Sequence, residues 1–123
     1  EVPTIAKIRG YCLGGGFGLA AAADIRLADM SATFSVPAAR LGLGYPVDAM
    51  ADIVSAIGAQ GAKRLLYTAE RFSADQMHSM GFLAEVIDPD VLDARVAEMA
   101  ATIAELAPLT HVSTKASIAF FIR

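Results

Sequence analysis

A cluster of glycines near the start of the chain is the feature that could most directly do chemistry. Residues 11–18 read YCLGGGFG and follow a short apolar run. A strand, a glycine turn and the start of a helix together aim unpaired backbone N–H groups, and the positive end of the helix, at an anion. The pattern therefore predicts a site at which the backbone itself contacts a ligand.

Four interpretations of this loop compete. A Walker A phosphate loop needs a lysine and a serine or threonine after the glycines, but Leu19 and Ala20 follow here, so this interpretation fails. Residues 16–21, GFGLAA, match a loose dinucleotide pattern, but Asp29 comes too soon after Gly16 to be the acid that such a site requires. The glycines could also merely permit close packing. The remaining interpretation is an oxyanion hole, in which an N–H at the helix start polarises a thioester carbonyl and stabilises the enolate that forms.

The other reactive side chains predict no second site. His78 and His111 fall in helical stretches with no cysteine or histidine partner at ligand spacing, so no metal site is expected. Cys12 is the single cysteine, which excludes an internal disulfide, and nothing near it marks an activated thiol. Arg40 is interpreted as a surface arginine, with a substrate carboxylate as the less favoured partner.

Strands and helices alternate around the loop, which predicts an α/β fold. Ser73 and Gln76 have the spacing of a capping box, and Gly81 is expected to end that helix. Pro89 is placed in the first turn of a long helix that carries one apolar stripe. Strands are predicted at 4–10, 25–28, 33–36 and 83–87, and helices at 16–23, 48–57, 59–69 and 73–81 and from residues 88 and 108 onward.

Composition limits the possible partners. Apolar residues make up 55% of the 123 residues and charged residues only 19%, against about 25% in an average soluble domain. We interpret this excess as a core that continues into a partner subunit or another stretch of the same chain. Both ends of the sequence also look cut. The net charge is −3 and no basic stripe occurs, so nucleic acid is an unexpected partner.

No targeting or membrane segment is expected. The longest uncharged run, residues 10–23, is too short and too rich in glycine to span a membrane. No signal or transit peptide is recognised, and the single cysteine fits a reducing compartment, so a cytoplasmic location is expected.

Several short runs together form a specific signature: PTIAKIRGYCLGGG at 3–16, DIR at 24–26, ATFSVP at 32–37, LGLG at 41–44 and MGFLAEVI at 80–87. This combination resembles the enoyl-CoA hydratase/isomerase (crotonase) family over nearly the whole chain. The resemblance implies a crotonase-like (ClpP/crotonase) spiral of ββα turns with a C-terminal helical trimerisation region. Residues 1–88 correspond to the second half of its core and residues 89–123 to part of the helical region, because family members are roughly twice as long.

The resemblance also implies a ligand and a site. The ligand is an acyl-CoA thioester, with coenzyme A as part of the substrate and no separate cofactor, and the protein is expected to form homotrimers or hexamers. Asp24 and Arg26 are expected to make internal salt bridges. The loop of Gly14, Gly15 and Gly16 forms the oxyanion hole, with Gly15 as its second N–H donor. Residues near the acyl pocket are Phe34, Pro37, Leu41, Leu43 and Tyr45, although a tyrosine at the last position is more often packing.

The chain departs from the family at its usual acids. The two glutamates of the hydratases correspond to Gly18 and Ala38, and neither residue can hold a proton or orient water. Other members carry a carboxylate about ten residues beyond Pro37, where Asp48 stands here. Asp48 is therefore interpreted either as an N-cap of the following helix or as a relocated base or nucleophile.

Two hypotheses about function remain. The three glycines favour an enzyme whose chemistry needs the oxyanion hole and few acids, such as isomerisation, decarboxylation or hydration with a relocated base. The missing glutamates favour a non-catalytic CoA-binding or assembly protein. With one oxyanion donor and half a pocket, these 123 residues alone are predicted to be inactive.

Overall fold

The computed structural model describes residues 2–42 and 44–121. Within them, six short strands form two three-stranded sheets. The first sheet is parallel and has the order β1 (Ile5–Ile8), β3 (Ile25–Asp29) and β6 (Glu85–Ile87). The second has β2 (Tyr11–Leu13) parallel to β4 (Thr33–Ser35), and β4 antiparallel to β5 (Phe72–Ser73).

The chain visits both sheets twice in succession, first through β1 and β2 and then through β3 and β4. β1 and β2 are joined by a tight turn at Gly10, whose φ of 63° favours glycine, and β3 and β4 follow each other closely in the same way. Ile5 pairs with Ile25 in the first sheet and Cys12 pairs with Phe34 in the second, so the two strand pairs lie side by side and parallel in both sheets. This is the ββα spiral that the resemblance implies, and the α/β prediction is confirmed.

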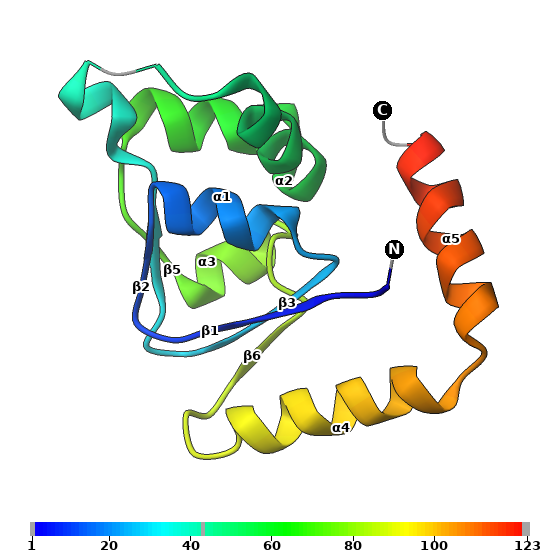
Figure 1. Ribbon diagram of the computed structural model, residues 1–123. Coiled ribbons are helices and arrows are strands. Elements are labelled where there is room, and N and C mark those ends of the chain that lie inside the picture. The colour runs from blue at the N-terminus through cyan, green and yellow to red at the C-terminus, as the bar shows by residue number, and fades with distance from the viewer. Residues whose placement is uncertain (1, 43, 122–123) are drawn as a thin grey trace.

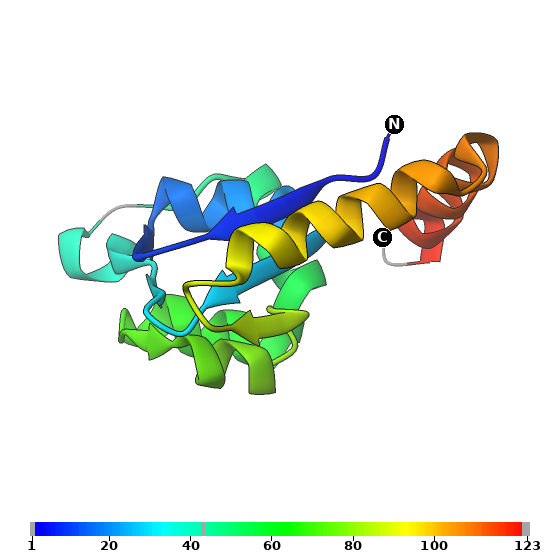
Figure 2. The ribbon, with the colours of Figure 1, turned by 90° about the horizontal axis from the view of Figure 1, so that it is seen from below.

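Helices cover the sheets on two sides. Figures 1 and 2 show α4 (Leu92–Glu105) along the side of the first sheet opposite α1 (Gly15–Ala22) and α3 (Ala74–Ser79), while α5 (Pro108–Phe121) leads away from the core. No helix in the described part of the chain has the length and apolarity needed to cross a bilayer. The helices are α1 (Gly15–Ala22), the 3-10 helix η1 (Pro37–Leu41), α2 (Val47–Thr68), α3 (Ala74–Ser79), α4 (Leu92–Glu105) and α5 (Pro108–Phe121).

Helix boundaries agree with the sequence where a local signal fixes them. Ser73 and Gln76 form the predicted capping box, and Gly58, with φ 76° and ψ 168°, separates two helical parts of α2. The prediction that Pro89 lies in the first turn of the long helix is wrong. The Asp88 carboxylate instead accepts the N–H of Asp90 at 2.9 Å, a local turn that delays the start of α4 to Leu92.

Three phenylalanines from distant parts of the chain form the centre of the core. Phe17 of α1 stacks on Phe82 with ring centroids 4.5 Å apart, and Phe34 of β4 meets both rings edge-on at 6.3 and 5.8 Å. All three side chains are fully buried. Since Phe17 is two residues beyond Gly15, this cluster fixes the start of α1 on the second sheet.

Arg26 fixes the other end of α1, although not as predicted. Its guanidinium donates to the carbonyls of Ala20, Ala21 and Ala23 at 2.6–3.3 Å and to that of Phe82 at 2.6 Å. The expected salt bridge of Arg26 is therefore wrong, because the side chain binds backbone oxygens. The one expected for Asp24 is present, to Lys115 at 2.9 Å.

Candidate functional site

The site begins at Gly14, where β2 turns into α1. Gly14 has φ 51° and ψ −117°, a conformation that side chains disfavour. Its N–H donates to the carbonyl of Ser35 on β4 at 2.9 Å, and its carbonyl accepts the N–H of Gly18 at 3.1 Å. Gly14 is therefore held from both sides, by the sheet and by the helix.

Gly15 and Gly16 present the free end of the helix. Both are exposed, and a Cβ at either position would meet no other atom within 4 Å. The first N–H groups of a helix lack intrahelical acceptors, and in residues 2–42 and 44–121 the N–H of Gly15 has no acceptor. The open space and the unpaired N–H allow a ligand oxygen to lie directly on the backbone.

Tyr45 reaches this loop from the segment between η1 and α2. Its hydroxyl donates to the carbonyl of Gly14 at 3.0 Å, and the side chain is half-buried. Burial raises the pKa of Tyr45, with the neighbouring Cys12 adding to the rise, so the phenol keeps its proton at neutral pH. Tyr45 therefore packs beside the glycine loop, and its place near an acyl pocket stays a prediction.

The two glutamate positions offer no acid. Gly18 is buried in α1 beneath the Tyr45 hydroxyl, and Ala38 is half-buried in η1, packed against the core. A larger residue at position 18 would have to displace the tyrosine, because its Cβ would lie 2.7 Å from the Tyr45 hydroxyl oxygen.

Asp48 is exposed in the first turn of α2. The prediction that it caps this helix is wrong, since Pro46 is the N-cap and its carbonyl accepts the N–H of Met50 at 2.9 Å. Proline holds the extended conformation that an N-cap needs, so the helix begins two residues earlier than the aspartate alone suggests. The next residue, Ala49, faces Gly18. A role for Asp48 as base or nucleophile stays a prediction.

Of the predicted acyl-pocket residues, the side chains of Phe34, Pro37 and Tyr45 are described, and they lie in different surroundings. Phe34 belongs to the aromatic core and has no exposed surface, so its side chain supports the site from behind and lines no pocket. Pro37 lines a hollow of about 410 Å³ together with Leu13, Ser35, Ala69 and Arg71. Leu43 lies outside the described residues, and only the backbone of Leu41 is described.

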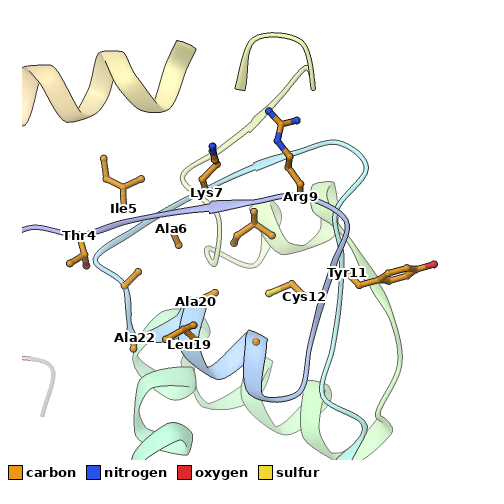
Figure 3. Close-up of a pocket in the computed structure, with 13 residues that line it drawn as sticks. Thr4, Ile5, Ala6, Lys7, Arg9, Tyr11, Cys12, Leu19, Ala20 and Ala22 are labelled. Carbon is orange, nitrogen blue, oxygen red and sulfur yellow. The ribbon is translucent and has the colours of Figure 1, made fainter. Parts of the chain in front are cut away.

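A larger groove, between β1 and α1, escaped the sequence analysis (Figure 3). It has a volume of about 580 Å³ and a mainly apolar wall that includes Ala6, Ile8, Cys12, Leu19 and Ala20. The alternation along β1 is the signal that could have revealed it. Ala6 and Ile8 are apolar and line the groove, whereas the charged ends of Lys7 and of the following Arg9 reach Asp93 of α4.

Lys7 of β1 and the following Arg9 are engaged in ion pairs with α4, and the thiol in the groove is inert. Lys7 and Arg9 contact Asp93 of α4 at 2.8 and 3.0 Å. Burial raises the pKa of Cys12 to about 11, so the thiol is not an activated nucleophile. Among the described residues, no three His, Cys, Asp or Glu side chains gather as a metal site.

Comparison with known proteins places this geometry in a family. The family model described as enoyl-CoA hydratase/isomerase matches residues 1–120. The mevalonyl-coenzyme A hydratase of Aspergillus fumigatus is 35% identical over 106 residues, which are 86% of this chain and 39% of that protein.

Solved structures agree. An enoyl-CoA hydratase/carnitine racemase from Magnetospirillum magneticum superposes with a TM-score of 0.94 at 35% identity, covering 98% of this chain and 45% of that one. A methylmalonyl CoA decarboxylase superposes with a TM-score of 0.92 at 27% identity, covering 98% of this chain and 47% of that one. The chain thus spans less than half the length of these three proteins. It belongs to the enoyl-CoA hydratase/isomerase family.

Proposed function

We propose that the protein carrying this chain binds an acyl-CoA thioester and holds the thioester carbonyl on the N–H of Gly15. The observation that carries the proposal is the unpaired, exposed N–H at the start of α1, on a glycine turn held by β4. When the α-carbon loses a proton or a carboxylate group, negative charge develops on the carbonyl oxygen. The N–H of Gly15 stabilises this charge. Removal of one such donor typically lowers kcat by a factor of about 10²–10³.

The reaction class follows from the missing acids. Gly18 and Ala38 provide no carboxylates, so hydration through a pair of glutamates at these positions is not part of the proposal. Isomerisation, decarboxylation, or hydration with a base supplied elsewhere all need the same enolate stabilisation. The proteins similar to this chain include one named as a decarboxylase and one named as a hydratase, so both reaction classes are kept in the proposal. Asp48, exposed in the first turn of α2, is the candidate for a relocated base.

The test uses the intact protein that carries this chain and a panel of acyl-CoA thioesters. Gly15→Pro removes the N–H at the first helical position, where proline is tolerated. We expect kcat to fall about 10²–10³-fold while the circular dichroism spectrum stays that of the wild type. An unchanged kcat with the fold intact would remove Gly15 from the mechanism. Asp48→Ala separately tests the base: unchanged turnover of every active thioester would exclude that role.

The second candidate function is non-catalytic binding of coenzyme A or assembly, and the absence of acids at Gly18 and Ala38 is what favours it. The two functions differ in one measurement on the intact protein. Binding of acyl-CoA by calorimetry without turnover of any thioester in the panel would favour this second function over the first.

The site also needs a second oxyanion donor and the rest of the pocket. We place both on a further ββα unit that covers the open edge of β1 and β2 and the groove beside α1, since both strands are edge strands here. The 123 residues alone are therefore expected to show no turnover of acyl-CoA. Measurable turnover by the isolated chain, with its intact mass verified, would contradict this expectation.

We also propose that the intact protein forms homotrimers or hexamers and that α4 and α5 contribute to the contact between subunits. Several apolar side chains of α5 are exposed, with Leu109 at 83% and Ile118 at 55%. An apolar helix face of this kind is typical of a surface that packs against another subunit. Native mass spectrometry of the intact protein tests the proposal, and a monomer at micromolar concentration would contradict it.

A further inference from the structure

Tyr45 and Gly18 form a matched pair from two different elements. A Cβ at position 18 would lie 2.7 Å from the Tyr45 hydroxyl oxygen and 3.7 Å from the Cβ of Ala49. The first distance is shorter than a carbon and an oxygen tolerate, whereas the second is ordinary contact. The lack of a side chain at position 18 is therefore what allows the phenol to reach the loop.

The phenol acts on one particular peptide group. Its hydroxyl donates to the Gly14 carbonyl at 3.0 Å, alongside the N–H of Gly18 at 3.1 Å. The carbonyl of Gly14 and the N–H of Gly15 belong to the same planar peptide and point in opposite directions. Whatever fixes the Gly14 oxygen therefore also fixes the direction of the Gly15 N–H.

A second donor on the carbonyl also changes the strength of that N–H. Hydrogen bonds in a chain polarise one another, by roughly 10–30% per bond. Tyr45 and Gly14 are both half-buried, so the hydroxyl covers part of the surface around this oxygen. The phenol is neutral, because burial raises the pKa of Tyr45, so it remains a donor across the neutral range.

The geometry points to Tyr45 as a positioning residue that orients and polarises the Gly15 N–H for the thioester carbonyl, with Gly18 providing the space for it. This inference rests on the proposed function, since it assumes that Gly15 is the oxyanion donor. The hydroxyl of Tyr45 occupies the space beside the position that a Cβ of residue 18 would take, and it donates to the backbone there.

The test is spectroscopic and uses the intact protein that carries this chain. The probe is dimethylaminocinnamoyl-CoA, whose absorption moves to the red when its thioester carbonyl is polarised. Wild type is expected to produce a red shift. Tyr45→Phe is expected to bind the probe with a Kd within about threefold, to keep half or less of the shift, and to lower kcat about tenfold with KM little changed. Tyr67→Phe, at an exposed tyrosine of α2, is the matched control and should behave as wild type.

A second variant tests the pairing from the other side. Gly18→Ala places a methyl group against the hydroxyl and should reproduce the loss of red shift. In the Tyr45→Phe background the clashing oxygen is gone and the nearest remaining ring atom, Cζ, is 3.8 Å away, so Gly18→Ala should cause no further loss. Additive losses would overturn the pairing. Alanine favours a helix more than glycine does, so Gly18→Ala does not weaken α1 through helix propensity. If either single variant folds poorly, the double variant still tests the pairing.

The outcomes separate this inference from the proposed function. A wild-type red shift that survives in full in Tyr45→Phe overturns the role of the tyrosine and leaves Gly15 as donor. Binding of the probe to wild type without any red shift overturns the oxyanion role of Gly15 and, with it, the inference.

Discussion

At the scale of single residues, Arg26 holds the end of α1 as Gly14 holds its start. Its four hydrogen bonds all go to backbone carbonyls, and the guanidinium lies over the Phe82 ring at 4.8 Å. Three of those carbonyls are at the C-terminal end of α1, where a positive charge also complements the helix dipole. Burial lowers the pKa of Arg26, but the residue stays charged because an arginine titrates far above neutral pH.

We predict that Arg26→Met lowers the free energy of unfolding by about 2–3 kcal/mol, since buried carbonyls lose a charged donor. Urea unfolding followed by circular dichroism measures this change. Arg64→Met is the control, because that arginine is exposed and pairs with Glu70 on the surface. Equal effects of the two substitutions would contradict the capping role of Arg26.

At the scale of elements, local signals were readable from the sequence and distant contacts were not. The capping box at Ser73 and the break at Gly58 depend on neighbouring residues, so both could be predicted. The contact of Tyr45 with Gly14 joins residues 31 positions apart, and no local pattern encodes it. β2 and β5 are too short, at three and two residues, for a periodic pattern to reveal them. The glycine loop was predicted because its architecture is itself local.

The docking of α4 on β6 is predicted to weaken in acid. Glu85 of β6 pairs with Arg95 of α4 at 2.7 Å, and the hydrogen bond from Arg95 lowers the pKa of Glu85. A carboxyl whose folded pKa is lowered stabilises the fold above its unfolded pKa, about 4.3, and loses this contribution as the pH falls through the folded value. The free energy of unfolding should therefore fall less steeply between about pH 5 and pH 3 in Glu85→Gln than in wild type.

The control for this pH profile is Glu105→Gln, at an exposed glutamate of α4 for which the described residues provide no ion-pair partner. Its profile should match that of wild type. Parallel profiles for wild type and Glu85→Gln would show that the pair with Arg95 contributes nothing to the acid sensitivity.

At the scale of the whole molecule, α5 stands apart from the core and is held at few points (Figure 2). Lys115 donates to the carboxylate of Asp24 and to the carbonyl of Val2, both at 2.9 Å, and His111 contacts the carbonyl of Ile103 at 2.9 Å. Most other side chains of α5 are exposed. The cytoplasmic location and the division of the chain at residue 88 stay predictions.

We predict that Lys115→Met increases amide exchange across α5 about two- to fivefold, in line with the loss of one partly exposed ion pair. Hydrogen exchange read by mass spectrometry localises the change, and the core strands should exchange at the wild-type rate. Lys63→Met, at an exposed lysine of α2, is the control. Unchanged exchange in α5 would show that Lys115 does not hold it.

The parallel sheet has a consequence for how the chain folds during synthesis. β3 is the central strand, yet its partner β6 and the third core ring, Phe82, leave the ribosome long after β3 itself. At about 5–20 residues per second, Phe17 and Phe34 wait several seconds without their partner. The nascent chain therefore exposes the apolar residues of α1 and β4 during that interval, and we expect a chaperone to bind this segment before Phe82 emerges.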